Sequence, residues 1–280
     1  MSEILSKKQA IEFSGLDPKT FENYFKNAGE FKCLERNGDR GRFRFKEDEL
    51  KKWKENRGWR TINLDIKDYA ICLDFALAQH FRGYVVSDWG TARQREFGQK
   101  ITNWVKGQLG EVAVQKFFKR EFNLDIELDF NIYDQIVPQD IIGVYERGKK
   151  RAPKIGVGIK SSKPKSAYLV LGDNEIKLPE RRSEIYIYCR PDIPDDHLLR
   201  IAKDEVIKLV KDKPLYPRYK YQIPSFVNIP CEVAGWCKAS ELKEVKSIPG
   251  QAFEYGTRFV IKSGLLHRSK EEWEKLLKLL

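Results

Sequence analysis

Histidine and cysteine, the usual zinc ligands, are scarce in this 280-residue chain, which has three histidines and five cysteines. The histidines stand alone at His80, His197 and His267, and no two cysteines have the close spacing of a zinc knuckle. We therefore expect no zinc site. The cysteines are odd in number and scattered, which indicates reduced thiols rather than a disulfide framework.

Long apolar runs are also lacking. No stretch approaches the roughly 18 consecutive apolar residues that a membrane-spanning helix needs. The first residues, M-S-E-I-L-S-K-K-Q, do not contain the apolar core of a signal peptide. The sequence therefore predicts a cytoplasmic protein without a membrane anchor. We find no internal repeat and no low-complexity tract.

Positive charge, by contrast, is abundant. The chain carries 52 lysines and arginines against 41 aspartates and glutamates, a formal net charge of +11. Such an excess favours a polyanionic partner, of which nucleic acid is the commonest. The alternative is a soluble protein that is merely basic. Hydrophobic residues make up 41% of the sequence, enough for one large domain or two smaller ones.

The N-terminal residues 1–60 have the pattern of a small separate domain. Ser6 is a suitable N-cap for a helix that ends before Gly15, with Leu5, Ala10 and Ile11 at helical spacing. Asp17 can cap a second helix, with Pro18 in its first turn, that runs to Ala28. Residues 31–45 predict two strands around N-G-D-R-G, a hairpin signal, and residues 46–57 predict a third helix.

Helix, tight turn, helix, basic hairpin and helix is an order that resembles the winged helix-turn-helix of excisionase and MerR-type proteins. The resemblance implies that the second helix enters the major groove of double-stranded DNA and that the hairpin contacts the backbone. The candidate DNA-binding residues are Lys19, Thr20, Asn23 and Lys26 on the outer face of the helix, and Arg40, Arg42 and Arg44 on one side of the hairpin. The alternative is a charged edge strand that discourages aggregation.

Residues 61–280 predict an α/β domain with a sheet core, joined to the first domain by a linker at residues 58–63. The expected helices cover residues 65–81 and 93–119, the second being bent around Gly107 and Gly110. The expected strands cover residues 125–132, 136–145, 154–160, 167–171 and 184–189.

Three charged residues stand out within this second domain. Glu111 lies in the helical segment G-Q-L-G-E-V-A-V, where an acid near a helix start can serve the helix dipole alone. Asp140 leads into the apolar run I-I-G-V and is costly to bury unless it is paired or bound to a metal. Lys160 closes the strand I-G-V-G-I-K, from which its long side chain can also extend to water.

The order of these residues resembles the PD-(D/E)XK nuclease superfamily, and type II restriction endonucleases in particular. The resemblance implies a central mixed sheet flanked by helices, and a sequence-specific, magnesium-dependent DNA endonuclease that acts as a homodimer. It assigns Asp140, Lys160 and Glu111 to catalysis. Mg²⁺ would be held by Asp140, Glu111 and the carbonyl of Ile159, and the DNA backbone would be contacted by Ser162 and Lys163.

One position departs from the family pattern. Gly158 stands two residues before Lys160, where the superfamily has a metal-binding acid. Glu111 can supply the missing carboxylate, or a neighbour such as Asp129 or Asp134 can. Otherwise the chain binds DNA without cutting it, as a regulator would. A structure-specific repair nuclease is a further alternative. We expect an active enzyme that uses Glu111.

Overall fold

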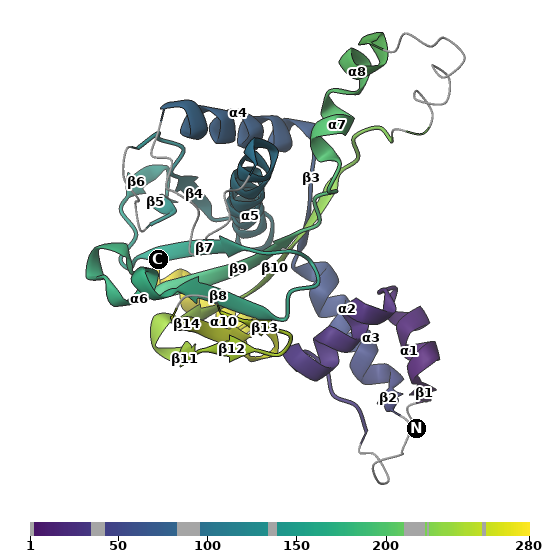
Figure 1. Cartoon of the computed structure of the whole chain (residues 1–280). Helices are drawn as coiled ribbons and strands as arrows, with labels where there is room; N and C mark the ends of the chain where they lie inside the picture. Colours follow the sequence, from purple (N-terminus) through teal and green to yellow (C-terminus); the bar gives the residue numbers. More distant parts are fainter. Residues whose placement is uncertain are drawn as a thin grey trace.

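The computed structural model describes residues 3–34, 43–82, 96–133, 139–209, 222, 224–253 and 256–280. A body built around β-sheets carries an N-terminal helical module and an arm formed by α7 (His197–Ile201) and α8 (Lys203–Leu209). In Figure 1 both project to the right of the body, the arm above and the module below. In the described part of the chain, no helix has the length and apolar character needed to cross a membrane.

The central sheet is mixed, as the sequence predicts. Its strands lie in the order β3 (Thr61–Leu64), β10 (Ile229–Lys238), β9 (Ile185–Pro191) and β7 (Val157–Ser161). β7 and β9 run parallel, whereas the other neighbours are antiparallel. All of β9 is buried, and its side chains alternate between two apolar clusters, one on each face of the sheet.

The two faces of this sheet are covered differently. Helix α5 (Phe97–Phe122) lies across one face, with α4 (Ile66–Arg82) packed on α5. Trp273 of α10 (Lys270–Leu279) stacks edge-on against Phe117 and Phe118 of α5. The other face packs against a second sheet, in the order β11 (Lys243–Val245), β14 (Arg258–Lys262) and β8 (Tyr168–Gly172).

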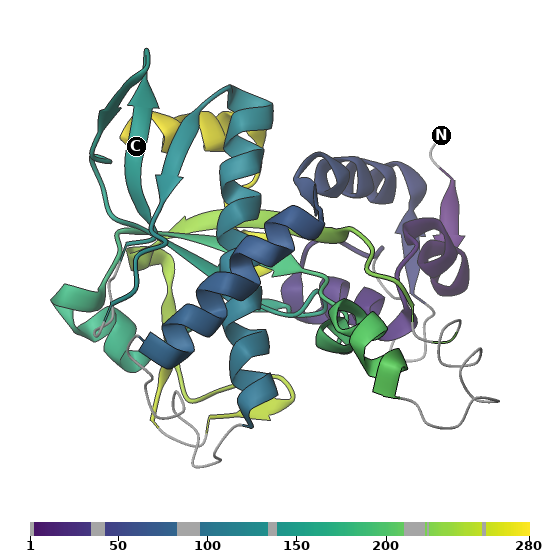
Figure 2. The same cartoon turned by 90° about the horizontal axis from the view of Figure 1, so that it is seen from above.

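A third sheet is joined to the central one through the backbone of Asp140. It is an antiparallel meander of β4 (Asp125–Leu128), β5 (Ile141–Glu146) and β6 (Lys149–Arg151). The backbone of Asp140 links the two sheets, because its carbonyl accepts from the Asp129 N–H at 3.1 Å and its own N–H donates to the Val157 carbonyl at 3.1 Å. Beyond this point the strands splay apart (Figure 2).

The remaining short elements connect these layers. They are α6 (Asp173–Lys177) after β8, a two-stranded ribbon of β12 (Ser247–Ile248) and β13 (Gln251–Ala252), and 3₁₀ turns at Pro179–Arg181, Ala239–Glu241 and Ser263–Leu265.

The three predicted helices of the N-terminal module are confirmed. α1 (Lys7–Ser14) begins with a capping box between Ser6 and Gln9 and ends at Gly15 with φ of 73°. Asp17 caps α2 (Pro18–Glu22), which continues as a π-helix over Asn23–Ala28. α3 (Glu47–Trp59) follows the hairpin segment and turns Leu50 and Trp53 inward.

The predicted hairpin is described only at its ends. Leu34 and Arg44 form a β-bridge, and residues 35–42, which include Arg40 and Arg42, lie outside the described residues. β2 (Arg44–Lys46) instead pairs with β1 (Ile4–Ser6). The sequence pattern was misleading for Leu5, because its side chain completes the module's apolar cluster from a strand rather than from the first helix.

The predicted linker at residues 58–63 is wrong. α3 is followed after one residue by β3, and that residue, Arg60, is only 1% exposed. Its Nη1 donates to the carbonyl oxygens of Val233 and Ala234 at 3.1 and 2.6 Å, and lies 3.3 Å from the Glu232 carboxylate. The chain is therefore anchored to β10 where a flexible joint was expected.

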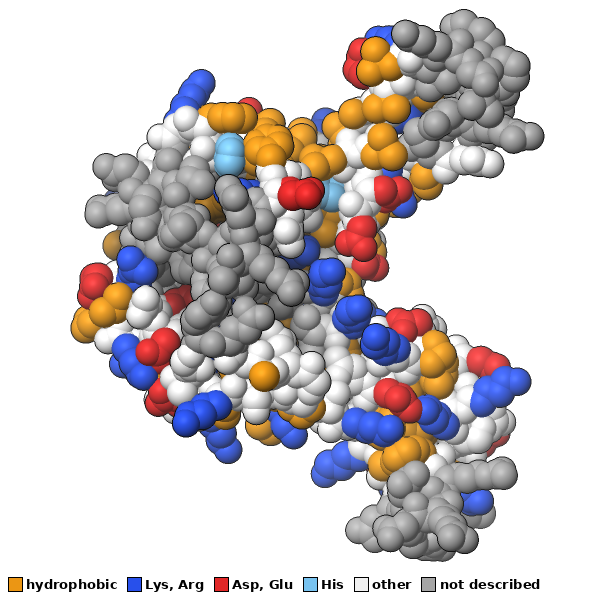
Figure 3. All heavy atoms as spheres, in the orientation of Figure 1, with side chains coloured by type: hydrophobic (Ala, Val, Ile, Leu, Met, Phe, Trp, Pro, Cys, Tyr) orange, Lys and Arg blue, Asp and Glu red, His pale blue; other side chains and the backbone are white. Residues whose placement is uncertain are grey.

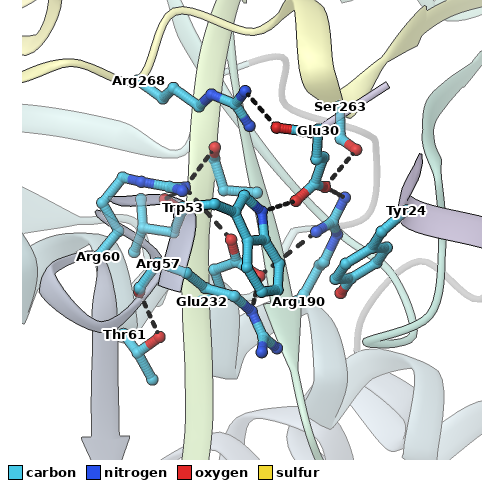
Figure 4. Close-up of polar contacts among 12 residues, drawn as sticks. Tyr24, Glu30, Trp53, Arg57, Arg60, Thr61, Arg190, Glu232, Ser263 and Arg268 are labelled. Atoms are coloured by element: carbon cyan, nitrogen blue, oxygen red, sulfur yellow. Dashed lines mark hydrogen bonds and ion pairs between the residues drawn. The ribbon is translucent and has the colours of Figure 1, made fainter. Parts of the chain in front are cut away.

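Arg60 belongs to a buried ion network between the module and the central sheet (Figure 4). Arg190 of β9 lies 2.7 Å from Glu30 of the module and 3.3 Å from Glu232 of β10. Glu30 also accepts hydrogen bonds from Ser263 Oγ at 2.6 Å and Trp53 Nε1 at 3.0 Å. Despite burial, the positive charge of Arg190 lowers the pKa of Glu30. The network is thus charged and fixes the module on the sheet.

Replacing Arg190 by methionine should destabilise the protein strongly. The change leaves Glu30 and Glu232 buried without their shared cation, and breaking a buried pair in this way costs about 3–5 kcal/mol. Denaturant unfolding of R190M measures the loss. The control is R182M, which removes an exposed arginine and should change stability by less than about 0.5 kcal/mol. Equal stability of the two variants would contradict the role given to the network.

A second charged contact ties the C-terminal helix to the body. His267 stacks on Trp236 with ring centroids 4.4 Å apart. Its Nδ1 lies 3.0 Å from Glu272 and its Nε2 lies 2.8 Å from Glu241. Burial opposes the charged ring, but hydrogen bonds to Glu272 and Glu241 outweigh it and raise the pKa of His267. The imidazolium, which donates from both nitrogens, suits this position best.

Stability should therefore fall as the pH rises above neutrality. The His267 pKa is higher in the folded than in the unfolded state, so its contribution is complete below the unfolded value of about 6.5 and is lost as the pH rises through the folded value. Unfolding measured between pH 6 and 9 should show this decline in the wild type. In H267Q the decline should be smaller, and an identical pH profile would rule the contact out as its source.

Candidate active site

The helix that carries Glu111 differs from the predicted one. α5 runs without a bend through Gly107 and Gly110, so Glu111 lies in its middle and not near its start. An interaction with the helix dipole therefore does not explain the acid. Gly110 serves packing instead: a Cβ there would lie 2.0 Å from Ser161 Oγ. The missing side chain lets α5 lie close on β7 and β9.

Glu111 is a buried acid on the sheet-facing side of α5, with 7% exposure. Gln108 Nε2, one turn earlier, donates to Glu111 Oε1 at 2.8 Å. Burial raises the pKa of Glu111 well above its usual value, and the negative charge of Asp140 raises it further. The two carboxylates predicted to act together are therefore close enough to repel one another.

Asp140 occupies the junction of the two sheets described above. Its Oδ2 accepts from the Ile159 N–H at 2.5 Å, which holds the side chain against β7. Burial raises the pKa of Asp140, while Lys160 and the Ile159 N–H oppose that effect. The Ile159 contact involves its N–H, and the predicted metal contact of its carbonyl stays a prediction.

Lys160 points from β7 toward α6. Its Nζ lies 2.6 Å from Glu175 Oε1. Burial works against the charged amine, but Glu175 and then Asp140 raise the pKa of Lys160 above its usual value. The ammonium group is therefore placed between two acids and stays protonated. Glu175 was not singled out in the sequence because it lies 15 residues beyond Lys160 on a separate short helix.

The structure gives a steric reason for Gly158. A Cβ at this position would lie 3.0 Å from Ser183 Oγ and 3.2 Å from the ring of Tyr186. A side chain at position 158 would therefore press on Ser183 and Tyr186 unless these shift slightly. Glu175 brings a carboxylate to the same face of β7, beside Lys160, from the neighbouring helix.

The two other candidate acids, Asp129 and Asp134, have different outcomes. Asp129 accepts hydrogen bonds from Asn131 Nδ2 at 2.7 Å and from the Tyr133 hydroxyl at 2.9 Å, and its charge still contributes to raising the pKa of Glu111 and Asp140. Asp134 falls outside the described residues.

The N-terminal residues proposed for DNA contact are not all on one open face. Lys19, Lys26 and Arg44 are exposed, but Thr20 is buried, so its predicted outward position is wrong. Asn23 Nδ2 donates to the carbonyl of Lys165 in the larger domain. The second helix therefore packs one side against the loop after β7, because Tyr24, its neighbour, also donates to Pro164 there.

That loop belongs to a basic region. Ser162 is half-buried, with its N–H bonded to the Cys189 carbonyl at 3.0 Å, and Lys163 is exposed. Burial and then the positive charge of Lys163 lower the pKa of Lys106 on α5, so these two lysines are neighbours. Lysine and arginine side chains gather in the hollow where the body meets the N-terminal module, whereas acidic side chains line the part of the hollow next to the arm (Figure 3).

The acids near Lys160 can be tested as a metal site by their donor chemistry. Among the described residues, no group of three or more histidines, cysteines, aspartates or glutamates is arranged to hold a metal ion. Buried Glu111 and half-buried Asp140 are nevertheless two carboxylates that repel each other, and hard cations such as Mg²⁺ prefer carboxylate oxygens. The pair fits a magnesium ion that keeps several water ligands.

Comparisons with known proteins add no family to this description. Neither models of protein families, nor curated proteins, nor solved structures gave a match to the chain.

The isosteric variants D140N and E111Q should each stabilise the metal-free protein at pH 7, by about 1 kcal/mol. Both acids have raised pKa values, so the folded state loses stability as the pH rises through them, and removing one charge relieves this loss. Denaturant unfolding in EDTA provides the measurement. E175Q is the matched control. It removes the ion-pair partner of Lys160 and should therefore lower the stability. A destabilised D140N would contradict the repulsion between the acids.

Proposed function

We propose that the protein is a magnesium-dependent DNA endonuclease of the PD-(D/E)XK type, acting in a type II restriction system. The observation that carries the proposal is the meeting of Glu111, Asp140 and Lys160 where β5 and β7 join beneath α5. A helix with a glutamate, a strand led by an aspartate and a strand with a lysine occur in the order that the sequence resemblance implies.

In this proposal each residue has a separate task. Asp140 and Glu111 hold Mg²⁺, which when bound polarises the scissile phosphate and lowers the pKa of a bound water. Lys160 keeps its proton through Glu175 and Asp140, so its task is to offset negative charge on the phosphate and to orient the water. Glu175 holds Lys160 in place and, beside Gly158, is a second candidate for the carboxylate that the family motif supplies.

DNA binding is supported by the distribution of charge. The exposed Lys19, Lys26 and Arg44 belong to the module, and Lys163 lies near Lys106 on the body. A basic hollow attracts the phosphate backbone. Since one such site cuts one strand, cleavage of both strands at a two-fold DNA sequence needs a homodimer. The homodimer and a cytoplasmic location remain part of the proposal.

The test is cleavage of plasmid and bacteriophage DNA by the purified protein with Mg²⁺ and with EDTA. We expect discrete fragments only with Mg²⁺. D140N and K160M should cut at least about 100-fold more slowly, the scale of losing a transition-state electrostatic contact. K177M removes an exposed lysine of α6 and E180Q an exposed acid, and both should cut like the wild type.

The same digest separates the metal-binding acids. E111Q should be as inactive as D140N if Glu111 is the second ligand. If E175Q loses cleavage and E111Q retains it, the second metal ligand is Glu175 and not Glu111. Wild-type rates in D140N would refute the site, and since that variant is expected to be stable, misfolding would not obscure the result.

A non-catalytic DNA-binding regulator is the second candidate, and Gly158 favours it because the motif acid is absent. That function predicts shifted DNA in a mobility assay without cleavage under any divalent cation. Cleavage restricted to branched or damaged substrates would instead indicate a repair nuclease.

A further inference from the structure

Gln108 is a buried amide beside the candidate catalytic acids. It lies on α5 one turn before Glu111, and its side chain is only 5% exposed. Its Nε2 donates to Glu111 Oε1 at 2.8 Å, so the amide group faces this carboxylate. A polar side chain is thus enclosed next to an acid that the proposed function assigns to the metal.

The second half of the same amide has no partner. Gln108 Oε1 is buried and accepts no hydrogen bond from any described residue. Since Oε1 and Nε2 are bonded to one carbon atom, the unmet oxygen also lies next to Glu111. A buried acceptor without a donor is unfavourable, so a donor from outside the described chain would stabilise this oxygen.

The neighbouring charged groups do not supply that donor. Burial and then the charge of Asp140 raise the pKa of Glu111, so a second acid is close. The nearby ammonium group of Lys160 is engaged by Glu175 at 2.6 Å. The amide oxygen therefore adds one more acceptor to a group of carboxylates. Such a group suits a hydrated cation, because Mg²⁺ bound through one or two carboxylates keeps several water ligands.

Gln115, one turn after Glu111 on the same helix, shows how a glutamine serves packing here. Its Nε2 donates to the Ile126 carbonyl at 2.9 Å and so ties α5 to β4. Gln108 makes no hydrogen bond of this kind to the described residues of a neighbouring strand, since its amide donates to Glu111. Its burial is therefore linked to the acid and not to the attachment of the helix.

We propose that Gln108 is a positioning residue of the candidate magnesium site. This inference rests on the proposed function, since it takes Glu111 and Asp140 as ligands of Mg²⁺. Gln108 Nε2 holds Glu111 Oε1, and Gln108 Oε1 accepts a hydrogen bond from a water molecule of the hydrated ion. One side chain thus orients a carboxylate ligand and a water ligand together.

Magnesium binding in the absence of DNA tests the proposal independently of cleavage. Denaturant unfolding of the full chain is measured over a series of MgCl₂ concentrations at constant ionic strength, since binding to the folded state raises its stability. Q108M has a similar size but lacks both hydrogen-bonding groups. The Mg²⁺ concentration that gives the same gain in stability should be about tenfold higher in Q108M than in the wild type.

Q115M is the matched control for that experiment. It makes the same chemical change on the same helix, at a glutamine that binds β4 and not Glu111. Q115M should respond to Mg²⁺ at the same concentrations as the wild type. D140N, which lacks one of the proposed ligands, should lose most of the gain in stability.

A second variant, Q108E, separates the two halves of the amide. It keeps an acceptor oxygen but removes the amide donor to Glu111. We expect Q108E to be less stable than the wild type in EDTA, because a third acid joins Glu111 and Asp140, and to bind Mg²⁺ more tightly than Q108M. Equal loss of Mg²⁺ affinity in both variants would show that only the hydrogen bond to Glu111 matters, and the role given to Oε1 would be wrong.

The proposal is overturned if Q108M responds to Mg²⁺ like the wild type, or if the wild type itself gains no stability from Mg²⁺. Failure of the nuclease proposal has a different signature. A wild type that binds Mg²⁺ and leaves every DNA substrate uncut refutes the nuclease, whereas a tenfold loss of affinity in Q108M still supports the role of Gln108.

Discussion

The structure depends on a buried cation, the Arg190 guanidinium, held between two carboxylates. Glu30 comes from the N-terminal module and Glu232 from the central sheet, and both lie within 3.3 Å of Arg190. Charges are costly to bury, so this arrangement persists only when all partners are in place together. Module and sheet therefore form one unit, and the basic residues of both are held in fixed positions relative to one another.

The candidate active site likewise depends on one residue, Asp140, that holds separate elements together. Asp140 joins two sheets through its backbone and is held to β7 through its side chain. Burial raises the pKa of both acids, and the charge of Asp140 raises that of Glu111 further, while Lys160 opposes this effect. Perturbed pKa values of this kind are common at functional sites.

The sequence was informative where interactions between residues close in the chain determine the structure. Caps at Ser6 and Asp17 and the left-handed Gly15 mark helix limits without reference to the rest of the chain. The order of Glu111, Asp140 and Lys160 was also readable, because each lies in an apolar segment with a recognisable period. Helices α1 to α5 and strands β5, β7, β8 and β9 could be predicted in this way.

Long-range contacts account for the errors. Leu5 joins a strand because β2 offers it a partner 40 residues away, and Thr20 is buried by packing that helical spacing does not reveal. The supposed linker became a rigid turn because Arg60 finds carbonyls on β10. Glu175 was missed for the same reason, since only folding brings α6 beside Lys160.

The sequence by itself determined the helices of the N-terminal module, the two long helices of the body, the positive charge and the choice of three candidate catalytic residues. Only the tertiary structure showed what surrounds Gly158, where a side chain would press closely on Ser183 and Tyr186. It also decided which carboxylate accompanies Lys160 and how the module is held. The physical reason is that caps and periodicity act over a few residues, whereas burial and charge pairing act between segments that the chain brings together only when it folds.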